Sequence, residues 1–285
     1  MKRILKGFER IDYKENPEAE KLGTPFDLNM AMGSERSMRK RDMFSEHKNR
    51  DRMVLRLRVF LSLMVGICFL MRIGEHLQPA AGYKGTAQAL LRRHITFTDQ
   101  NDRPIAYSNV GHVKAYGVHV NTTHGKTDSK GAGRRNHQAR QEGDLEECCP
   151  VCVMENFIMV TRDEYGAKEE DPLYHIPGLP RYTQDTMHEV MNYVMEDLHM
   201  GVVGRFTSHS LRYGGATMLA AAGFPQYVIE MYGGWAKDSK SLRKYIKVSP
   251  KLVKMVSAQM AEMAKSSSAI FFIVEAFMIQ KSRRV

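Results

Sequence analysis

The sequence has few of the features that mark secreted, fibrous or disordered proteins. It contains only four cysteines and one tryptophan in 285 residues. Four cysteines in a chain of this length do not make the disulfide framework of a small secreted domain. We therefore expect a reducing compartment, the nucleus in a eukaryote and otherwise the cytoplasm. Ordinary glycine and proline contents, with 43% hydrophobic residues, exclude fibrous and wholly disordered classes.

The sequence also lacks an apolar run long enough to cross a bilayer. The longest run covers residues 59–71, well short of the roughly 20 residues that a membrane-spanning helix needs. A second run, residues 269–278, is shorter and is interrupted by Glu275. We expect both runs to be buried helices and predict no membrane partner.

Charge of one sign is in excess. The chain has 42 Lys and Arg against 32 Asp and Glu, a formal net charge of +10, which favours a polyanionic partner. Basic residues concentrate in three segments, residues 36–58, 126–140 and 237–254, whereas residues 142–171 are strongly acidic. This pattern predicts one basic face and an acidic segment that extends away from it. An ordinary mixed, solvated surface is the alternative interpretation of each patch.

Hydrophobic periodicity predicts a mostly α-helical protein with a small antiparallel β-sheet, an α+β class. Residues 50–77 form one long predicted helix, apolar nearly all round in its second half. Val, Thr and aromatic residues predict strands at 94–98 and 112–122, followed by a basic, turn-rich loop from His124. Further helices, with glycine, proline or capping signals at their ends, are predicted at residues 185–199, 210–222, 225–232 and from 250 onward.

These elements divide the chain into three predicted parts. Residues 1–49 are polar and irregular or partly helical, residues 50–265 form the main domain, and residues 266–285 form a C-terminal tail helix.

A set of polar residues follows the predicted helices of the main domain. His209 and Arg212 are three residues apart at a helix start, so both side chains point to the same side. The only tryptophan, Trp235, comes 23 residues after Arg212, and Tyr245 comes ten residues later.

Two further motifs precede this set in the chain. Arg72 and Glu75, in RIGE, lie three residues apart at the end of the predicted apolar helix. Lys126, in GKTD, lies in the basic loop after the strand pair. Either motif alone is common in unrelated proteins.

In this order, RIGE at Arg72, GKTD at Lys126, HSLRYGGAT at His209 and GGW at Trp235 resemble the catalytic domain of the tyrosine recombinase (phage integrase) family. The residues around the motifs are most similar to recombinases of eukaryotic mobile elements. The resemblance covers residues from about 50 to 250. It implies a site-specific DNA recombinase or integrase, a DNA strand transferase that cleaves and rejoins DNA through a 3′-phosphotyrosyl intermediate.

The resemblance implies a role for each motif residue. Arg72 and Arg212 would hold the scissile phosphate, because guanidinium groups match phosphate geometry. Tyr245 would attack the phosphorus, and Lys126 would protonate the leaving 5′-oxygen. No cofactor and no metal would be needed.

Three residues would support this chemistry. His209 would take or hold the tyrosine proton, and Trp235 would donate its indole N–H to the phosphate or pack the helix of the nucleophile. Glu75 would orient an arginine or histidine from behind.

The implied partner is double-stranded DNA, bound by a homo-oligomer, a tetramer on DNA. The tail at residues 269–280 would dock on a neighbouring protomer or fold back on its own core. Further basic residues are candidate DNA contacts: Lys130, Arg134, Arg135, Lys237, Lys240, Arg243 and Lys244.

Two departures from the family pattern favour alternatives. The family spacing between the His or Trp position and the nucleophile is about nine residues, whereas Trp235 and Tyr245 are ten apart. The 49 residues before the main domain are also too few for the DNA-clamping domain of the family. The alternatives are a catalytically decayed DNA-binding protein of the same fold and a type IB topoisomerase-like enzyme.

Each motif residue also has a structural interpretation. Arg72 could reach water from an apolar helix, His209 could cap a helix, and Trp235 could be a core aromatic. Lys130 is the rival of Lys126 as general acid, and Tyr232 is the near rival of Tyr245 as nucleophile.

A cluster of thiols invites a metal interpretation. Cys148, Cys149 and Cys152 form CCPVC, and His137 or His175 could complete a zinc ligand set. Because zinc ligands usually come as two close pairs, we favour a structural or surface thiol cluster.

Overall fold

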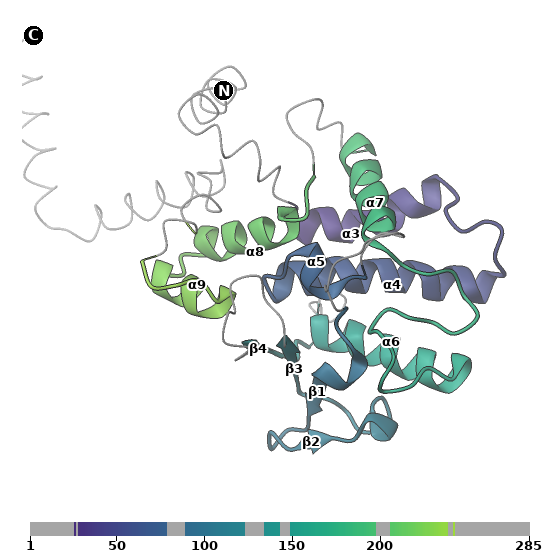
Figure 1. Cartoon of the computed structure of the whole chain (residues 1–285), viewed down its shortest axis with the longest axis horizontal. Helices are drawn as coiled ribbons and strands as arrows, with labels where there is room; N and C mark the ends of the chain where they lie inside the picture. Colours follow the sequence, from purple (N-terminus) through teal and green to yellow (C-terminus); the bar gives the residue numbers. More distant parts are fainter. Residues whose placement is uncertain are drawn as a thin grey trace, which may run out of the picture.

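The computed structural model describes residues 26, 28–78, 89–122, 134–142, 149–197, 206–238 and 242. These residues form a mostly helical body with one four-stranded antiparallel sheet (Figure 1). The predicted fold class is therefore confirmed.

Helix α4 (Asn49–Cys68) lies at the centre of the described part of the chain. It packs against α3 (Leu28–Lys40), α6 (Pro150–Tyr165) and α8 (Ser210–Ala221) (Figure 1). Its second half is buried on all sides, as its apolar composition predicts. None of the helices within the described ranges is long and apolar enough to span a membrane.

Helix α4 ends earlier than the sequence predicts. Leu70 has φ of 51°, in the left-handed region, and the Met71 N–H donates to the Gly66 carbonyl at 2.9 Å. This is the Schellman pattern of a helix end. The left-handed position in that pattern is usually occupied by glycine. A separate short helix, α5 (Ile73–His76), follows. The prediction of one helix over residues 50–77 was wrong because a leucine, not a glycine, takes the left-handed position.

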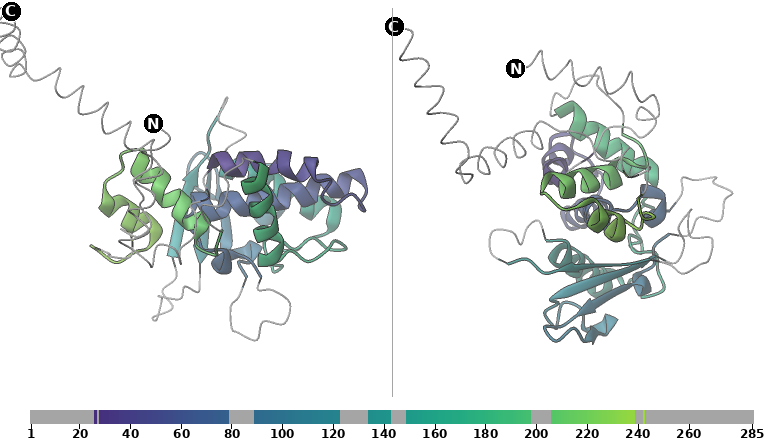
Figure 2. Two further views of the ribbon diagram at one scale, coloured as in Figure 1. Left: turned by 90° about the horizontal axis from the view of Figure 1, so that it is seen from above. Right: turned by 90° about the vertical axis from the view of Figure 1, so that its left-hand side faces the viewer.

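The sheet has the order β2–β1–β3–β4 and lies to one side of the helices (Figure 2, right). Its strands are β1 (Ile95–Thr98), β2 (Pro104–Ile105), β3 (Gly117–Thr122) and β4 (Arg134–Ala139). The predicted strand at 94–98 is confirmed, whereas only the second half of 112–122 is a strand. Strand β4 begins inside the predicted loop, where Arg134 and Arg135 pair with β3, so that part of the loop prediction was wrong.

The described part of the acidic segment, residues 142 and 149–171, does not extend away from the body. It contains α6, which buries Met154, Phe157 and Ile158 and packs on α4. Glu155 is buried too and pairs with Arg140 at 2.6 Å. Residues 150–165 form an amphipathic helix although the segment is acidic, so the prediction of a projecting segment was wrong for the residues that the structure describes.

The remaining helices agree with their predictions. They are α7 (Gln184–Asp197) and α9 (Gln226–Gly233), together with α8. Helix α7 packs on α3, which lies within the segment predicted as irregular or partly helical. The predicted helices from residue 250 and at 266–285 lie outside the described residues.

Candidate functional site

Three segments that are far apart in the sequence meet around the side chain of Arg212. Its Nη1 donates to the Leu70 carbonyl and its Nη2 to the Gly233 carbonyl, both at 2.7 Å. The Ile73 N–H donates to the Ser208 carbonyl at 3.0 Å. The end of α4, the start of α5, the start of α8 and the end of α9 are therefore held together by one buried arginine and a backbone contact.

Two glycines let α8 approach α4 closely enough for these bonds. A Cβ on Gly215 would overlap the Ile67 carbonyl oxygen, and a Cβ on Gly66 would overlap the Leu211 side chain. Neither position leaves room for even a methyl group. The sequence shows Gly215 within HSLRYGGAT, but it does not show that Gly66 of α4 lies against Leu211 of α8.

Arg72 and Arg212 share the carboxylate of Glu75. Arg72 Nη1 lies 2.8 Å from Glu75 Oε1, and Arg212 Nη1 lies 3.8 Å from Glu75 Oε2. Glu75 Oε2 also accepts the Arg72 N–H at 2.8 Å. Two guanidinium groups and one carboxylate leave one positive charge in excess, which suits a bound anion.

The two arginines differ in their exposure. The Arg212 side chain is 4% exposed, whereas that of Arg72 is 21% exposed. Arg72 Nε is buried and makes no hydrogen bond to any residue that the structure describes. A buried donor of this kind costs free energy unless it meets an acceptor.

Trp235 covers Arg212. The Arg212 Cζ lies 4.0 Å from the centre of the Trp235 ring, a cation–π contact worth about 1–2 kcal/mol. Gly233 lies against the same ring, where a Cβ would collide with it. Trp235 thus packs on the Arg212 guanidinium and on Gly233, while its roles toward a phosphate or the helix of the nucleophile stay predictions.

His209 stands directly before α8, one turn before Arg212. Its carbonyl accepts the Tyr213 N–H at 2.9 Å, and its own N–H donates to Thr207 Oγ1 at 3.2 Å. Its side chain is half-buried. Backbone bonds therefore fix this residue at the helix start, as the spacing predicts.

Lys126 lies outside the described residues, as does Lys130. The strand that follows their segment, β4, docks on the end of α4. Asn136 Nδ2 donates to the Phe69 carbonyl and Gln138 Nε2 to the Cys68 carbonyl, both at 2.7 Å. This strand therefore lies beside the segment that leads to Arg72.

Tyr245 also lies outside the described residues, together with Lys240, Arg243 and Lys244. Leu242, three residues before Tyr245, is buried in a cluster with Tyr213, Ala216 and Ile229. That contact holds the chain against α8 shortly before the predicted nucleophile.

The rival nucleophile, Tyr232, has a structural position. Its hydroxyl donates to the carbonyls of Cys68 and His137, both at 3.0 Å, and contacts the Gln138 side-chain amide. Tyr232 thus ties α9 to α4 and β4.

Of the predicted DNA contacts, Arg135 and Lys237 are exposed, and the backbone of Arg134 lies in β4.

Among the described residues, the thiols and histidines do not converge. Cys149 is buried and Cys152 half-buried, while Cys148 lies outside the described residues. His137 instead contacts His119, with His137 Nδ1 3.1 Å from His119 Nε2. No group of three His, Cys, Asp or Glu side chains in the described ranges is arranged to hold a metal ion.

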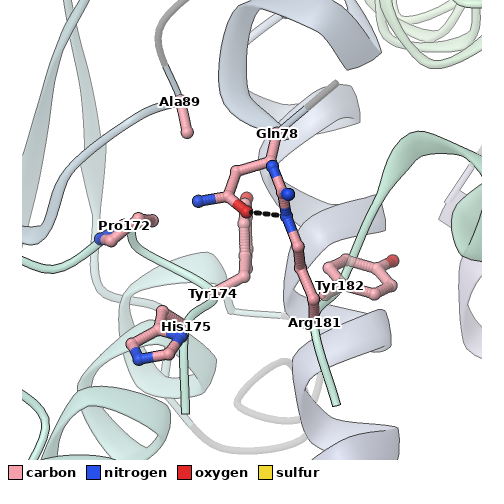
Figure 3. Close-up of a pocket in the computed structure, with 7 residues that line it drawn as sticks. All are labelled: Gln78, Ala89, Pro172, Tyr174, His175, Arg181 and Tyr182. Atoms are coloured by element: carbon pink, nitrogen blue, oxygen red, sulfur yellow. Dashed lines mark hydrogen bonds between the residues drawn. The ribbon is translucent and has the colours of Figure 1, made fainter. Parts of the chain in front are cut away.

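A small cavity lies apart from the arginine cluster (Figure 3). Arg181 Nε donates to Gln78 Oε1 at 2.6 Å across it, and Tyr174 lies beneath this pair. Its volume of about 10 Å³ suits one water molecule. Of the candidate residues named from the sequence, His175 alone lines it, and no residue of the arginine cluster does.

Two residues around the cluster escaped the sequence analysis. The left-handed Leu70 presents its carbonyl to Arg212, and nothing in the sequence indicates this conformation. Glu230 is 4% exposed and contacts the turn that carries Trp235. Glu230 is an acidic residue within an otherwise apolar helix, and this feature of the sequence could have indicated a buried, hydrogen-bonded carboxylate.

No family model matches the sequence, and no curated protein matches it. Among solved structures, the chain is similar to XerA recombinase, at 13% identity and a TM-score of 0.48, covering 83% of this chain and 65% of that one. It is also similar to XerH site-specific recombinase bound to difH substrate in a pre-cleavage complex, at 16% identity and a TM-score of 0.46, covering 83% and 54%.

A third similar structure is XerH bound to palindromic difH substrate in a post-cleavage complex, at 16% identity and a TM-score of 0.47, covering 83% and 53%. This chain thus spans between about half and two thirds of the length of the solved chains. These structures are recombinases, the class of protein that the sequence motifs resemble.

Proposed function

We propose that this chain is a tyrosine recombinase, a DNA strand transferase that cleaves and rejoins DNA through a 3′-phosphotyrosyl intermediate. One observation carries the proposal. Arg72 and Arg212, which come from distant parts of the chain, meet at the single carboxylate of Glu75. Two further motif residues adjoin Arg212 in the described part of the chain: His209 directly before α8, and Trp235, whose ring lies on the guanidinium.

This arrangement suits a phosphodiester. Phosphoryl transfer gathers negative charge on the non-bridging oxygens, so preorganised cations aimed at them lower the barrier. The cluster has one positive charge in excess, and Arg72 Nε has no acceptor among the described residues. A phosphate oxygen would supply that acceptor. Glu75 would keep both guanidinium groups in place without neutralising them.

The covalent step exchanges one phosphate ester for another. The Tyr245 oxygen attacks the phosphorus, the bond between the phosphorus and the 5′-oxygen breaks, and a 3′-phosphotyrosine forms. The tyrosine proton passes to His209, and Lys126 donates a proton to the leaving 5′-oxygen. The reverse attack, by a 5′-hydroxyl of the same or another strand, reseals the DNA. Because the number of phosphoester bonds is conserved, no ATP is consumed.

The partner in this proposal is double-stranded DNA. The excess of basic residues supports it, and exposed Arg135 and Lys237 are available for phosphate contacts. A tetramer on DNA is the oligomer that we expect from the sequence resemblance.

The test is formation of a covalent protein–DNA adduct. Duplexes with a randomised core are first enriched for binding to the protein, and are then nicked so that cleavage releases a short strand and is trapped. We expect an adduct that resists denaturant and disappears in Tyr245→Phe. Tyr227→Phe is the matched control, because Tyr227 is 68% exposed on α9.

Arg212→Ala and Arg93→Ala form a second matched pair. Arg212→Ala should abolish the adduct, whereas Arg93, an exposed residue, should be replaceable without loss. Salt-sensitive DNA binding without an adduct in the wild-type protein would contradict strand transfer and support a non-catalytic DNA-binding protein. An adduct accompanied by plasmid relaxation but no recombination would favour a topoisomerase.

A further inference from the structure

The turn that carries Trp235 is held by one buried carboxylate, that of Glu230. The Glu230 side chain lies on α9, and the residue is 4% exposed. Its Oε2 accepts the Asp238 N–H at 3.1 Å, and its Oε1 accepts Gln226 Nε2 at 2.7 Å. Its backbone carbonyl accepts the Trp235 N–H at 2.8 Å. Glu230 therefore binds both ends of the turn from Trp235 to Asp238.

The backbone of this turn needs such support. Gly234 has φ of 66° and Asp238 φ of 57°, so the chain enters and leaves the turn through left-handed residues. The first suits glycine, but the second costs free energy for an aspartate unless the surroundings hold it. The bond from the Asp238 N–H to Glu230 Oε2 is the contact that stabilises this second reversal.

We infer that Glu230 is a positioning residue: it fixes Trp235 over Arg212 and sets the direction in which the chain leaves toward Tyr245. This inference rests on the proposed function, since Tyr245 is the nucleophile there. Glu230 acts through the turn, and none of its contacts requires DNA. Leu242, the next described residue after Asp238, is buried in a cluster with Tyr213 and Ala216 of α8.

Trp235 gives a direct optical readout, because it is the only tryptophan in the chain. In Glu230→Ala, the turn loses its side-chain acceptor and Trp235 should leave the Arg212 guanidinium. We expect accessibility of the indole to acrylamide quenching to rise clearly above the wild-type value, with a shifted emission maximum. Glu230→Gln keeps one acceptor oxygen and should restore quenching close to wild type. Gln226→Ala removes only the partner of Oε1 and is the matched control.

The second readout is the rate of adduct formation at saturating DNA. Displacing a reacting group by about 1 Å costs up to about a hundredfold in rate. We expect Glu230→Ala to lower the rate at least about tenfold while the Kd for DNA stays near wild type. Glu230→Gln should recover most of the rate. Measurements are made well below the melting temperature of each variant, followed by far-UV circular dichroism.

The two proposals fail in different ways. If the wild-type protein forms no adduct, the proposed function fails, and the quenching experiment still decides the role of Glu230. Wild-type quenching and an unchanged adduct rate in folded Glu230→Ala would overturn the positioning role. Equal losses in Glu230→Ala and Glu230→Gln would overturn it as well, because they would show no dependence on the acceptor.

Discussion

The crossing of α8 and α4 allows a sharp test of how the arginine cluster is assembled. Gly215→Ala adds one methyl group at a position where it would overlap the Ile67 carbonyl oxygen and the Leu70 side chain. A backbone carbonyl cannot rotate away as a side chain can. The two helices must therefore separate, and the bond between Arg212 Nη1 and the Leu70 carbonyl must lengthen or break.

The expected magnitude follows from two opposing terms. Replacing glycine by alanine inside a helix stabilises it by about 1 kcal/mol. Overpacking a closely packed contact costs about 1–3 kcal/mol, and a rigid backbone neighbour places Gly215 at the upper end. The net effect is a loss of about 2 kcal/mol in the free energy of unfolding.

Gly33→Ala is the matched control. Gly33 lies in α3, and beyond its own helix a Cβ there would meet no atom of the described residues within 4 Å. Only the helix-propensity term applies, so this variant should gain about 1 kcal/mol. The same chemical change should therefore move stability in opposite directions at the two sites.

Urea denaturation followed by far-UV circular dichroism measures both variants. A second readout, Trp235 emission, should change in Gly215→Ala and stay constant in Gly33→Ala. If Gly215→Ala were as stable as the wild type or more stable, the two helices would not be in the close contact described, and our account of how Arg212 reaches Leu70 would be wrong.

Three further predictions concern other parts of the structure. Burial lowers the pKa of His76 to about 3. Between pH of about 6.5 and 3 the unfolded chain therefore binds a proton that the folded chain does not, and stability falls by about 1.4 kcal/mol per pH unit as the pH drops. His76→Gln should remove that contribution to the slope of urea stability against pH, and an unchanged slope would contradict it. Tyr232→Phe removes the hydrogen bonds to the carbonyls of Cys68 and His137 and should lower the free energy of unfolding, measured with urea, by about 1–2 kcal/mol. An unchanged free energy of unfolding would show that these bonds do not hold α9 to α4 and β4. Arg135→Ala and Lys237→Ala should each reduce, by about one, the slope of the logarithm of the DNA-binding constant against the logarithm of salt concentration. If neither variant changes this slope, Arg135 and Lys237 do not contact phosphates.

Helices α7, α8 and α9 were predictable because their signals are local. Apolar residues repeat at helical spacing, and a glycine stands where the chain must turn left-handed. Gly223, with φ of 85°, and Gly234, with φ of 66°, follow α8 and α9 as expected. Their identity and their position along the chain were sufficient.

The predictions that were wrong also have physical causes. Leu70 adopts the left-handed conformation without the glycine that signals it, so the end of α4 was missed. Strand β4 is polar, and its pairing with β3 and its bonds to the Phe69 and Cys68 carbonyls come from residues distant in sequence. Helix α6 lies in an acidic segment whose exposed carboxylates outweigh its buried face in any count of charge.

The sequence by itself determined the chemistry that is available: two arginines, a histidine, a carboxylate and a lone tryptophan, in a set order and on particular elements. Only the tertiary structure decided that Arg72 and Arg212 share Glu75, and that Trp235 covers the Arg212 guanidinium. The reason is the range of the interactions. Helix periodicity and capping act over a few residues, whereas the glycine crossing and the carbonyl bonds of Arg212 form only once distant segments have packed together.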